Sequence, residues 1–117
     1  MITIQPMLPD QSAQILEIYR HGIESGMATF ETEVPEWDEF KKKYLSHSRI
    51  VAIVNEKLAG WASLSPVSSR ACYNGVAEVS VYVHGNFQRQ GIGRELLISL
   101  ITESEKNGIW SLLSVIH

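Results

Sequence analysis

Apolar residues recur at helical spacing in the first third of the chain. The first such set forms one stripe: Ile15, Leu16, Tyr19 and Ile23. The pattern predicts a helix that begins after Pro9, takes Asp10 as its N-cap and runs to about Ile23. Glu17 and Arg20 fall on its wet side. A short strand, Ile2 to Ile4, is expected before it because apolar residues alternate there.

A second helix is expected from Pro35, because proline suits the first helical position. Its apolar residues are Trp37, Phe40 and Tyr44, which we assign to the core together with Trp61. Lysines 41–43 are expected to cover its outer, solvated face. The segment 28–31 between the two helices is predicted to be a loop.

Strand patterns fill the middle of the chain. Two β-prone runs, 50–54 and 58–64, flank the polar residues 55–57 and predict a hairpin whose second strand ends at Pro66. A further strand is expected at 76–83. Its valines at 79, 81 and 83 share one face, and Glu78, Ser80 and Tyr82 share the other. One face of this strand therefore carries side chains that could take part in chemistry.

The last third predicts a helix and a buried strand. From Ile92 the apolar residues repeat at helical spacing: Leu96, Leu97, Leu100 and Ile101. Asn107 and Gly108 supply the stop signal. The nearly continuous apolar run 109–116 is expected to be a strand buried on both faces.

Composition and charge narrow the class of protein. The chain has 117 residues, 44% hydrophobic and 20% charged, which fits one small domain spanning 1–117. A net charge of -3 gives no broad cationic field, so we expect neither a nucleic-acid nor a membrane partner. The single cysteine, Cys72, and the lack of an apolar leader indicate the cytoplasm. Four scattered histidines lack metal-ligand spacing, so no metal is expected.

The segment Gln88 to Gly93 lies between the strand 76–83 and the following helix. Glycines at 91 and 93 would let an anion approach the unpaired N–H groups of the first helical turn, and Arg89 and Arg94 flank that turn. Two glycines alone are a weak signal, since a close packing contact explains them equally well. The segment is neither a Walker sequence nor a dinucleotide fingerprint.

Here the sequence resembles the GCN5-related N-acetyltransferase superfamily, whose signature Gln/Arg-x-x-Gly-x-Gly/Ala is matched by Gln88, Gly91 and Gly93. Within it, the chain is most similar to phosphinothricin-type acetyltransferases. The resemblance is carried by four further segments: 28–32, 60–62, 70–73 and 78–83. It implies an α/β (α+β) fold in which a mixed central sheet is flanked by helices, and acetyl-CoA as co-substrate bound in a splay between two strands.

The resemblance also implies roles for individual residues. Glu78 matches the general base that takes the proton from the acceptor amine. The cofactor-binding set it implies is Val81, Tyr82, Val83, Gln88, Arg89, Gln90, Gly91, Ile92, Gly93 and Arg94. The substrate-binding set is Phe30, Glu31, Arg70 and Tyr73, in which Arg70 would pair with a carboxylate. Without that context, Glu78 and Arg70 read as solvated surface charges.

The chain departs from the family after residue 117. Members continue with a helix and two further strands, so this domain is expected to be incomplete and to lack the tyrosine that often protonates the thiolate. The leading interpretation is direct acetyl transfer to the primary amine of a small amino-acid-like acceptor, of the phosphinothricin or methionine sulfoximine type. Protein N-termini are an alternative acceptor, and an inactive fragment that binds CoA or a partner is the rival interpretation. The open edge of 109–116 suggests a homodimer.

Overall fold

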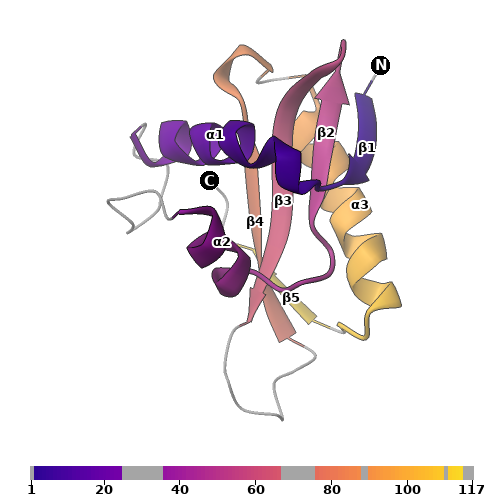
Figure 1. Cartoon of the computed structure of the whole chain (residues 1–117). Helices are drawn as coiled ribbons and strands as arrows, with labels where there is room; N and C mark the ends of the chain where they lie inside the picture. The colour runs from indigo at the N-terminus through magenta and orange to yellow at the C-terminus, as the bar shows by residue number, and fades with distance from the viewer. Residues whose placement is uncertain (1, 25–35, 67–75, 88–89, 110, 115–117) are drawn as a thin grey trace.

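Five strands form one mixed sheet in the computed structural model, which describes residues 2–24, 36–66, 76–87, 90–109 and 111–114 (Figure 1). The strands lie in chain order: β1 (Ile2–Pro6), β2 (Ile50–Val54), β3 (Lys57–Pro66), β4 (Val76–Val83) and β5 (Ser111–Ser114). Neighbours from β1 to β4 pair antiparallel, and β5 pairs with β4 in parallel. The expected mixed sheet is confirmed.

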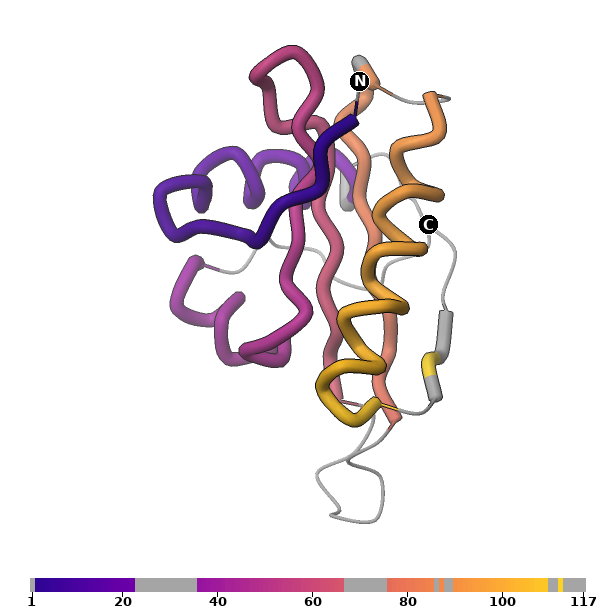
Figure 2. The backbone as a smooth tube through the Cα atoms, turned by 90° about the vertical axis from the view of Figure 1, so that its right-hand side faces the viewer, coloured from indigo at the N-terminus to yellow at the C-terminus, as the bar shows by residue number. Residues whose placement is uncertain are grey.

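Helices cover both faces of this sheet, as Figure 2 shows. On one face lies α3 (Ile92–Lys106). On the other lie α1 (Ser12–Glu24), which follows a short 3-10 turn at Pro9–Gln11, and α2 (Trp37–Lys43). A second 3-10 turn, Gly85–Phe87, follows β4. None of the helices in the described part of the chain is long and apolar enough to span a membrane.

Each face of the sheet has its own core. The α3 face is aliphatic and alanine-rich, with Leu64, Leu96 and Leu100 fully buried. The α1/α2 face is built around aromatic rings: Tyr19, Phe40, Tyr44, Trp61 and Tyr82. The alternation read from 76–83 is confirmed, because the β4 valines pack against the aliphatic core and Tyr82 belongs to the aromatic one.

Two helix starts differ from the sequence prediction. Asp10 is not the N-cap of the first helix. Helical backbone already begins at Pro9, because proline suits the first helical position, so Leu8 is the N-cap. The Leu8 N–H donates to Gln11 Oε1 at 2.8 Å. The second helix begins at Trp37 instead of Pro35, since Glu36 is extended (φ -70, ψ 164).

The hairpin between β2 and β3 is confirmed, and its turn is shorter than expected. Asn55 and Glu56 alone form it, both with positive φ (51 and 66). Two consecutive left-handed residues make the turn whose twist matches paired strands. The second strand ends at Pro66, as predicted.

The C-terminal elements follow the predicted pattern. α3 ends at Lys106, and Gly108 takes a positive φ of 81, so the stop signal is confirmed. The buried side chains of α3 are Ile92, Leu96, Leu100 and Ser104, and Ile101 is 39% exposed. β5 spans only four residues of the run 109–116, and residues 110 and 115–117 lie outside the described residues.

Candidate functional site

The edge of β4 that faces β5 is the first feature of the site. β5 pairs with β4 only from Val76 to Val79, and no described residue of β5 lies beside the rest of the strand. The His84 N–H bonds the Ala59 carbonyl at 2.7 Å on the β3 side. By the alternation of an antiparallel ladder, Val81 therefore directs its backbone N–H and C=O toward the opposite edge.

The N-terminus of α3 stands at the end of the same strand. A Cβ atom built on Gly93 would lie 3.7 Å from Val83 Cγ2, so the first turn of α3 rests against the end of β4. Gly91 is the N-cap, with φ 79 and no side-chain cap, and its carbonyl receives the first helical bond from Glu95 N at 3.1 Å. The first-turn N–H groups therefore have no partner within the helix.

The structure gives different physical reasons for the glycines at positions 91 and 93. At Gly91 a Cβ would meet no described atom within 4 Å, so the left-handed backbone, and not crowding, requires glycine. At Gly93 a Cβ would make an ordinary van der Waals contact, so a small side chain fits. At neither position, therefore, does a clash with a described atom require glycine.

Glu78 lies on β4 at the opposite end of this edge. It is half-buried and shares the α1/α2 face with Ser80 and Tyr82. On that face burial lowers the pKa of Lys43 and raises the pKa of Tyr44, and the charge of Glu78 acts on both groups in the raising direction, so the carboxylate lies near the end of α2. Between Val79 and Val83 the strand rises about 13 Å, which sets the scale of the edge that separates the carboxylate from the α3 turn.

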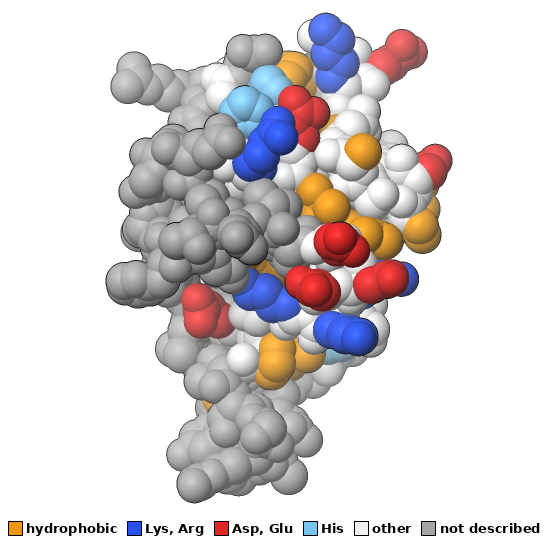
Figure 3. All heavy atoms as spheres, turned by 60° about the vertical axis from the view of Figure 1, so that its left-hand side comes forward, with side chains coloured by type: hydrophobic (Ala, Val, Ile, Leu, Met, Phe, Trp, Pro, Cys, Tyr) orange, Lys and Arg blue, Asp and Glu red, His pale blue; other side chains and the backbone are white. Residues whose placement is uncertain are grey.

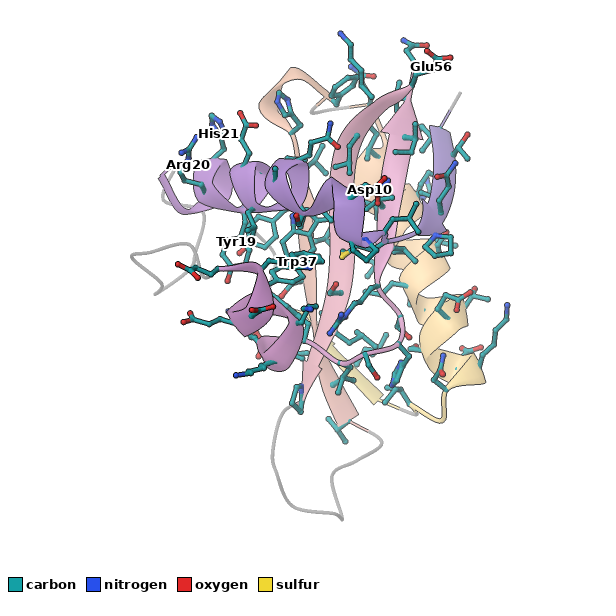
Figure 4. All side chains as sticks on the ribbon, in the orientation of Figure 1. Asp10, Tyr19, Arg20, His21, Trp37 and Glu56 are labelled. Carbon is teal, nitrogen blue, oxygen red and sulfur yellow. The ribbon has the colours of Figure 1, made fainter. Side chains whose placement is uncertain are left out.

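Two side-chain hydrogen bonds lie between the end of α2 and its neighbours. Lys43 Nζ donates to the Tyr19 hydroxyl at 2.8 Å, and the Tyr44 hydroxyl donates to Ser80 Oγ of β4 at 3.4 Å. Tyr19 and Tyr44 lie close enough that each affects the pKa of the other. Burial raises the pKa of each tyrosine, so both remain neutral donors and acceptors. Figure 4 shows Tyr19 in the space between α1 and α2, and Trp37, at the start of α2, packs against the same aromatic cluster.

All three lysines 41–43 are exposed, as expected of a solvated helix face, but their contacts differ. Lys41 pairs with Asp38 at 3.5 Å. The Lys43 ammonium instead lies over two rings, 5.5 Å from the Tyr19 centroid and 5.4 Å from that of Tyr44. The three consecutive lysines do not by themselves indicate which one contacts the aromatic rings. Only the helical spacing could have indicated it, because residue 43 lies three positions after the buried Phe40 and therefore on the same side of the helix.

Arg49 holds the end of α2 in place. Its guanidinium donates to three carbonyl oxygens, those of Leu45 at 2.6 Å, Lys41 at 2.7 Å and Tyr44 at 2.9 Å. Burial lowers the pKa of Arg49. Because the last carbonyls of a helix lack internal partners, this contact fixes the chain where Tyr44 turns toward β4. Sequence analysis missed Arg49.

The described part of the chain contains most of the predicted cofactor-binding residues. Val81 and Val83 lie on the part of β4 that the described residues of β5 do not reach, and Gln90 and Arg94 are exposed beside the α3 turn. Tyr82 is 6% exposed with its ring in the aromatic core, so only its backbone could reach a ligand. Six predicted site residues lie outside the described residues: Phe30, Glu31, Arg70, Tyr73, Gln88 and Arg89.

Surface charge and metal ligands add two observations on the described residues. On the face seen in Figure 3, acidic and basic side chains lie interspersed and neither sign forms a broad area. Among the side chains that the structure describes, no three His, Cys, Asp or Glu residues gather as metal ligands would.

The chain belongs to the acetyltransferase (GNAT) family, whose model matches residues 14–116. It is 31% identical, over 98% of its length, to a phosphinothricin N-acetyltransferase of Streptomyces viridochromogenes. It is 32% identical, over 82% of its length, to an L-methionine sulfoximine/L-methionine sulfone acetyltransferase of Salmonella typhimurium. The chain spans 65% of the first relative and 59% of the second.

A solved structure supports the same family and fold. The chain superposes with a TM-score of 0.87 and 27% identity on a GNAT superfamily phosphinothricin acetyltransferase from Sinorhizobium meliloti in complex with acetyl-CoA. The match covers 98% of this chain and 65% of that one. The family and the fold class predicted from the sequence are therefore confirmed.

Proposed function

We propose that the chain transfers an acetyl group from acetyl-CoA to the primary amine of a small amino-acid-like acceptor, by direct attack. The observation that carries the proposal is the course of β4, which runs from Glu78, past the positions that no described residue of β5 pairs with, to the α3 turn. The first-turn N–H groups would hold the pyrophosphate, and the Val81 edge would pair with the pantetheine arm as an added strand does.

In this proposal Glu78 acts as the general base. Its carboxylate takes a proton from the acceptor ammonium or attacking amine, the amine nitrogen forms a bond to the thioester carbon, and the carbon–sulfur bond breaks. A backbone N–H on β4 would stabilise the negative charge on the carbonyl oxygen. The departing thiolate takes up a proton from water. The relatives' names support an acceptor of the phosphinothricin or methionine sulfoximine type, with protein N-termini as the alternative.

Release of free CoA thiol from acetyl-CoA and a panel of amines tests the proposal. Glu78→Gln should lower turnover by about 10²- to 10⁴-fold, while CoA still raises the melting temperature as in the wild type. Glu56→Gln, on the exposed β2–β3 turn far from α2, is the matched control and should change neither quantity (Figure 4). A Glu78→Gln variant with full activity would show that the base is assigned wrongly.

The rival interpretation, binding of CoA or a partner chain without turnover, gives a different result in the same assay. CoA would raise the melting temperature, and no amine would release thiol. A homodimer and a cytoplasmic location stay predictions. Light scattering on the purified chain tests the first, since a monomer at high concentration would contradict it.

A further inference from the structure

A cavity of about 540 Å³ lies at the border of the sheet that β1 forms, away from the proposed active site on β4. Three segments line it: the end of β1 with Met7, the connection 46–50 that leads into β2, and α3 between Ile98 and Glu103. In Figure 1 these segments meet on the side of the sheet that β1 borders. Cavities of this size commonly hold a small organic molecule.

The cavity is separate from the β4 face that carries Glu78. Strands β2 and β3 lie between β1 and β4, and neighbouring strands are about 4.8 Å apart, so β1 is about 14 Å from β4. Ile98 is the first α3 residue of the cavity, and it follows Ile92, at the glycine turn, by about 9 Å along the helix. A ligand in this cavity therefore occupies a second site.

Arg49 brings a fixed positive charge to the wall of the cavity. Its Nε and Nη2 atoms donate to the carbonyl oxygens of Lys41, Tyr44 and Leu45 at 2.6–2.9 Å. These bonds use three of the five guanidinium donors. Among the described residues, none accepts from the other two donors, and no carboxylate lies within ion-pair distance of Arg49. Burial lowers the pKa of Arg49, so an anionic oxygen beside it is stabilising.

Glu103 brings a negative charge to the same cavity from α3. Its Oε1 atom lies 3.6 Å from Lys106 Nζ, and the two side chains are 40% and 67% exposed, so this ion pair is weak. Glu103 and Arg49 line one cavity without forming an ion pair with each other. Two opposite charges that do not reach one another are suited to a molecule that carries both.

Hydroxyl and apolar side chains complete the wall. Four hydroxyl groups line the cavity, those of Ser46, Ser48, Ser99 and Thr102. Because a hydroxyl group both donates and accepts hydrogen bonds, these residues can serve either end of a doubly charged ligand. Isoleucine side chains from β1, β2 and α3 contribute the apolar part, which suits a short hydrocarbon chain between the two charges.

We propose that this cavity binds a small zwitterion, a free α- or ω-amino acid, with its carboxylate at Arg49 and its ammonium at Glu103. Charge complementarity selects the ligand, because a simple anion meets the Glu103 carboxylate and a simple amine meets the Arg49 guanidinium. An N-acetylated amino acid carries no ammonium and is disfavoured for the same reason. The cavity therefore distinguishes free amino acids from their acetylated forms.

NMR titration of the chain with a graded set of ligands measures this selectivity. Glycine, 4-aminobutanoate and 6-aminohexanoate differ in the spacing of their two charges, whereas butanoate and butylamine each carry one. The best zwitterion should bind at least about 10-fold more tightly than either singly charged ligand. It should also shift the backbone amide signals of Ser99 and Thr102. Equal affinity for butanoate and the best zwitterion, or no binding of any zwitterion, overturns the proposal.

Two variants test the cavity without removing the bonds that Arg49 makes to α2. Glu103→Gln keeps the size of the side chain and should weaken the best zwitterion about 10-fold, while butanoate is not weakened. Ser99→Phe fills the cavity and should abolish binding. Glu105→Gln, at an exposed position of the same helix outside the cavity, is the matched control and should change nothing. Full binding by Glu103→Gln and Ser99→Phe would show that the ligand binds elsewhere.

The acceptor of the proposed reaction is also a zwitterion, so Glu78→Gln separates the two sites. Binding in the cavity should be the same in Glu78→Gln as in the wild type, with or without CoA. If Glu78→Gln loses the zwitterion and Glu103→Gln keeps it, the ligand lies at β4 and the cavity proposal is wrong. If the chain releases no thiol from acetyl-CoA but still binds the zwitterion through Glu103, the cavity site stands and the proposed turnover fails.

Discussion

The two faces of the sheet are built from different chemistry. The face under α3 is aliphatic, and its buried contacts are made by alanine, valine, leucine and isoleucine side chains. The face under α1 and α2 stacks Trp61 on Tyr19 and Tyr82 with centroid distances of 5.6 and 4.9 Å, and Phe40 meets Trp61 edge-on at 5.2 Å. Only the aromatic face carries buried polar atoms without partners among the described residues.

The difference assigns the two faces to different tasks. Aliphatic packing offers no polar contact, so the α3 face serves to hold a helix turn against β4. Aromatic side chains combine large apolar bodies with hydroxyl groups, so the other face can be buried and still present donors and acceptors. β4 thus packs on an aliphatic core on one side and on an aromatic core with hydroxyl groups on the other.

The largest effect is expected at Trp61, the centre of the aromatic face. Trp61→Ala should lower the free energy of unfolding by about 3–5 kcal/mol, measured by urea denaturation. Trp61→Phe should cost much less, because the indole N–H has no hydrogen-bond partner in the described structure and the ring contacts largely remain. Leu100→Ala gives the matched loss on the aliphatic face, about 2–5 kcal/mol. A Trp61→Phe variant as unstable as Trp61→Ala would show that the indole N–H is satisfied.

Gly22 tests how closely α1 approaches the aromatic face. Glycine to alanine ordinarily stabilises a helix, but a Cβ on Gly22 would lie 2.6 Å from the Tyr82 ring. Gly22→Ala should therefore destabilise the protein by about 1–3 kcal/mol in the same denaturation assay. Gln14→Ala, at an exposed position of the same helix, is the control and should be near neutral. Stabilisation by Gly22→Ala would mean that α1 can move away from Tyr82 at little cost.

The α3 turn gives a smaller contrast between two glycines. Gly91→Ala should cost about 1–2 kcal/mol of stability, because its φ is 79, and should weaken CoA binding measured by calorimetry. Gly93→Ala should be close to neutral in both, since its Cβ would make only an ordinary contact with Val83. Equal losses at the two positions would contradict the distinct reasons given for them.

The smallest expected effect is the pH dependence of stability contributed by Lys43. Folding lowers the pKa of this ammonium, so between its folded value and the unfolded value of about 10.4 the unfolded state binds more protons. The free energy of unfolding of the wild type should therefore rise with pH in that window, relative to Lys43→Met. Thermal melts of both proteins across neutral to alkaline pH measure this difference. The tyrosines and Glu78 are present in both proteins, so their contributions to the pH dependence largely cancel in the comparison. If the free energy of unfolding of the wild type, relative to Lys43→Met, falls with pH, then folding raises the pKa of Lys43 instead of lowering it.

The sequence predicted β4 completely, because strict alternation over 76–83 admits only one strand with two distinct faces. It also located the hairpin, from two β-prone runs that flank a polar turn, and the α3 turn, from glycines between a strand and a helical repeat; the structure adds that Asn55 and Gly91 take left-handed backbone there. It failed at Pro35 and Asp10, because several neighbouring residues can begin a helix and packing chooses among them.

By itself, then, the sequence determined the order of the elements, the two faces of β4 and the glycine turn, all of which follow from local backbone preference and periodicity. Only the tertiary structure decided that the Lys43 ammonium contacts Tyr19 and Tyr44 whereas Lys41 pairs with Asp38, and that Arg49 donates to the carbonyls at the end of α2. The Lys43 contact with Tyr19 spans 24 positions of the chain, and the Arg49 contacts depend on how the chain turns after α2. Their geometry depends on how helices settle on the sheet, which no local pattern encodes.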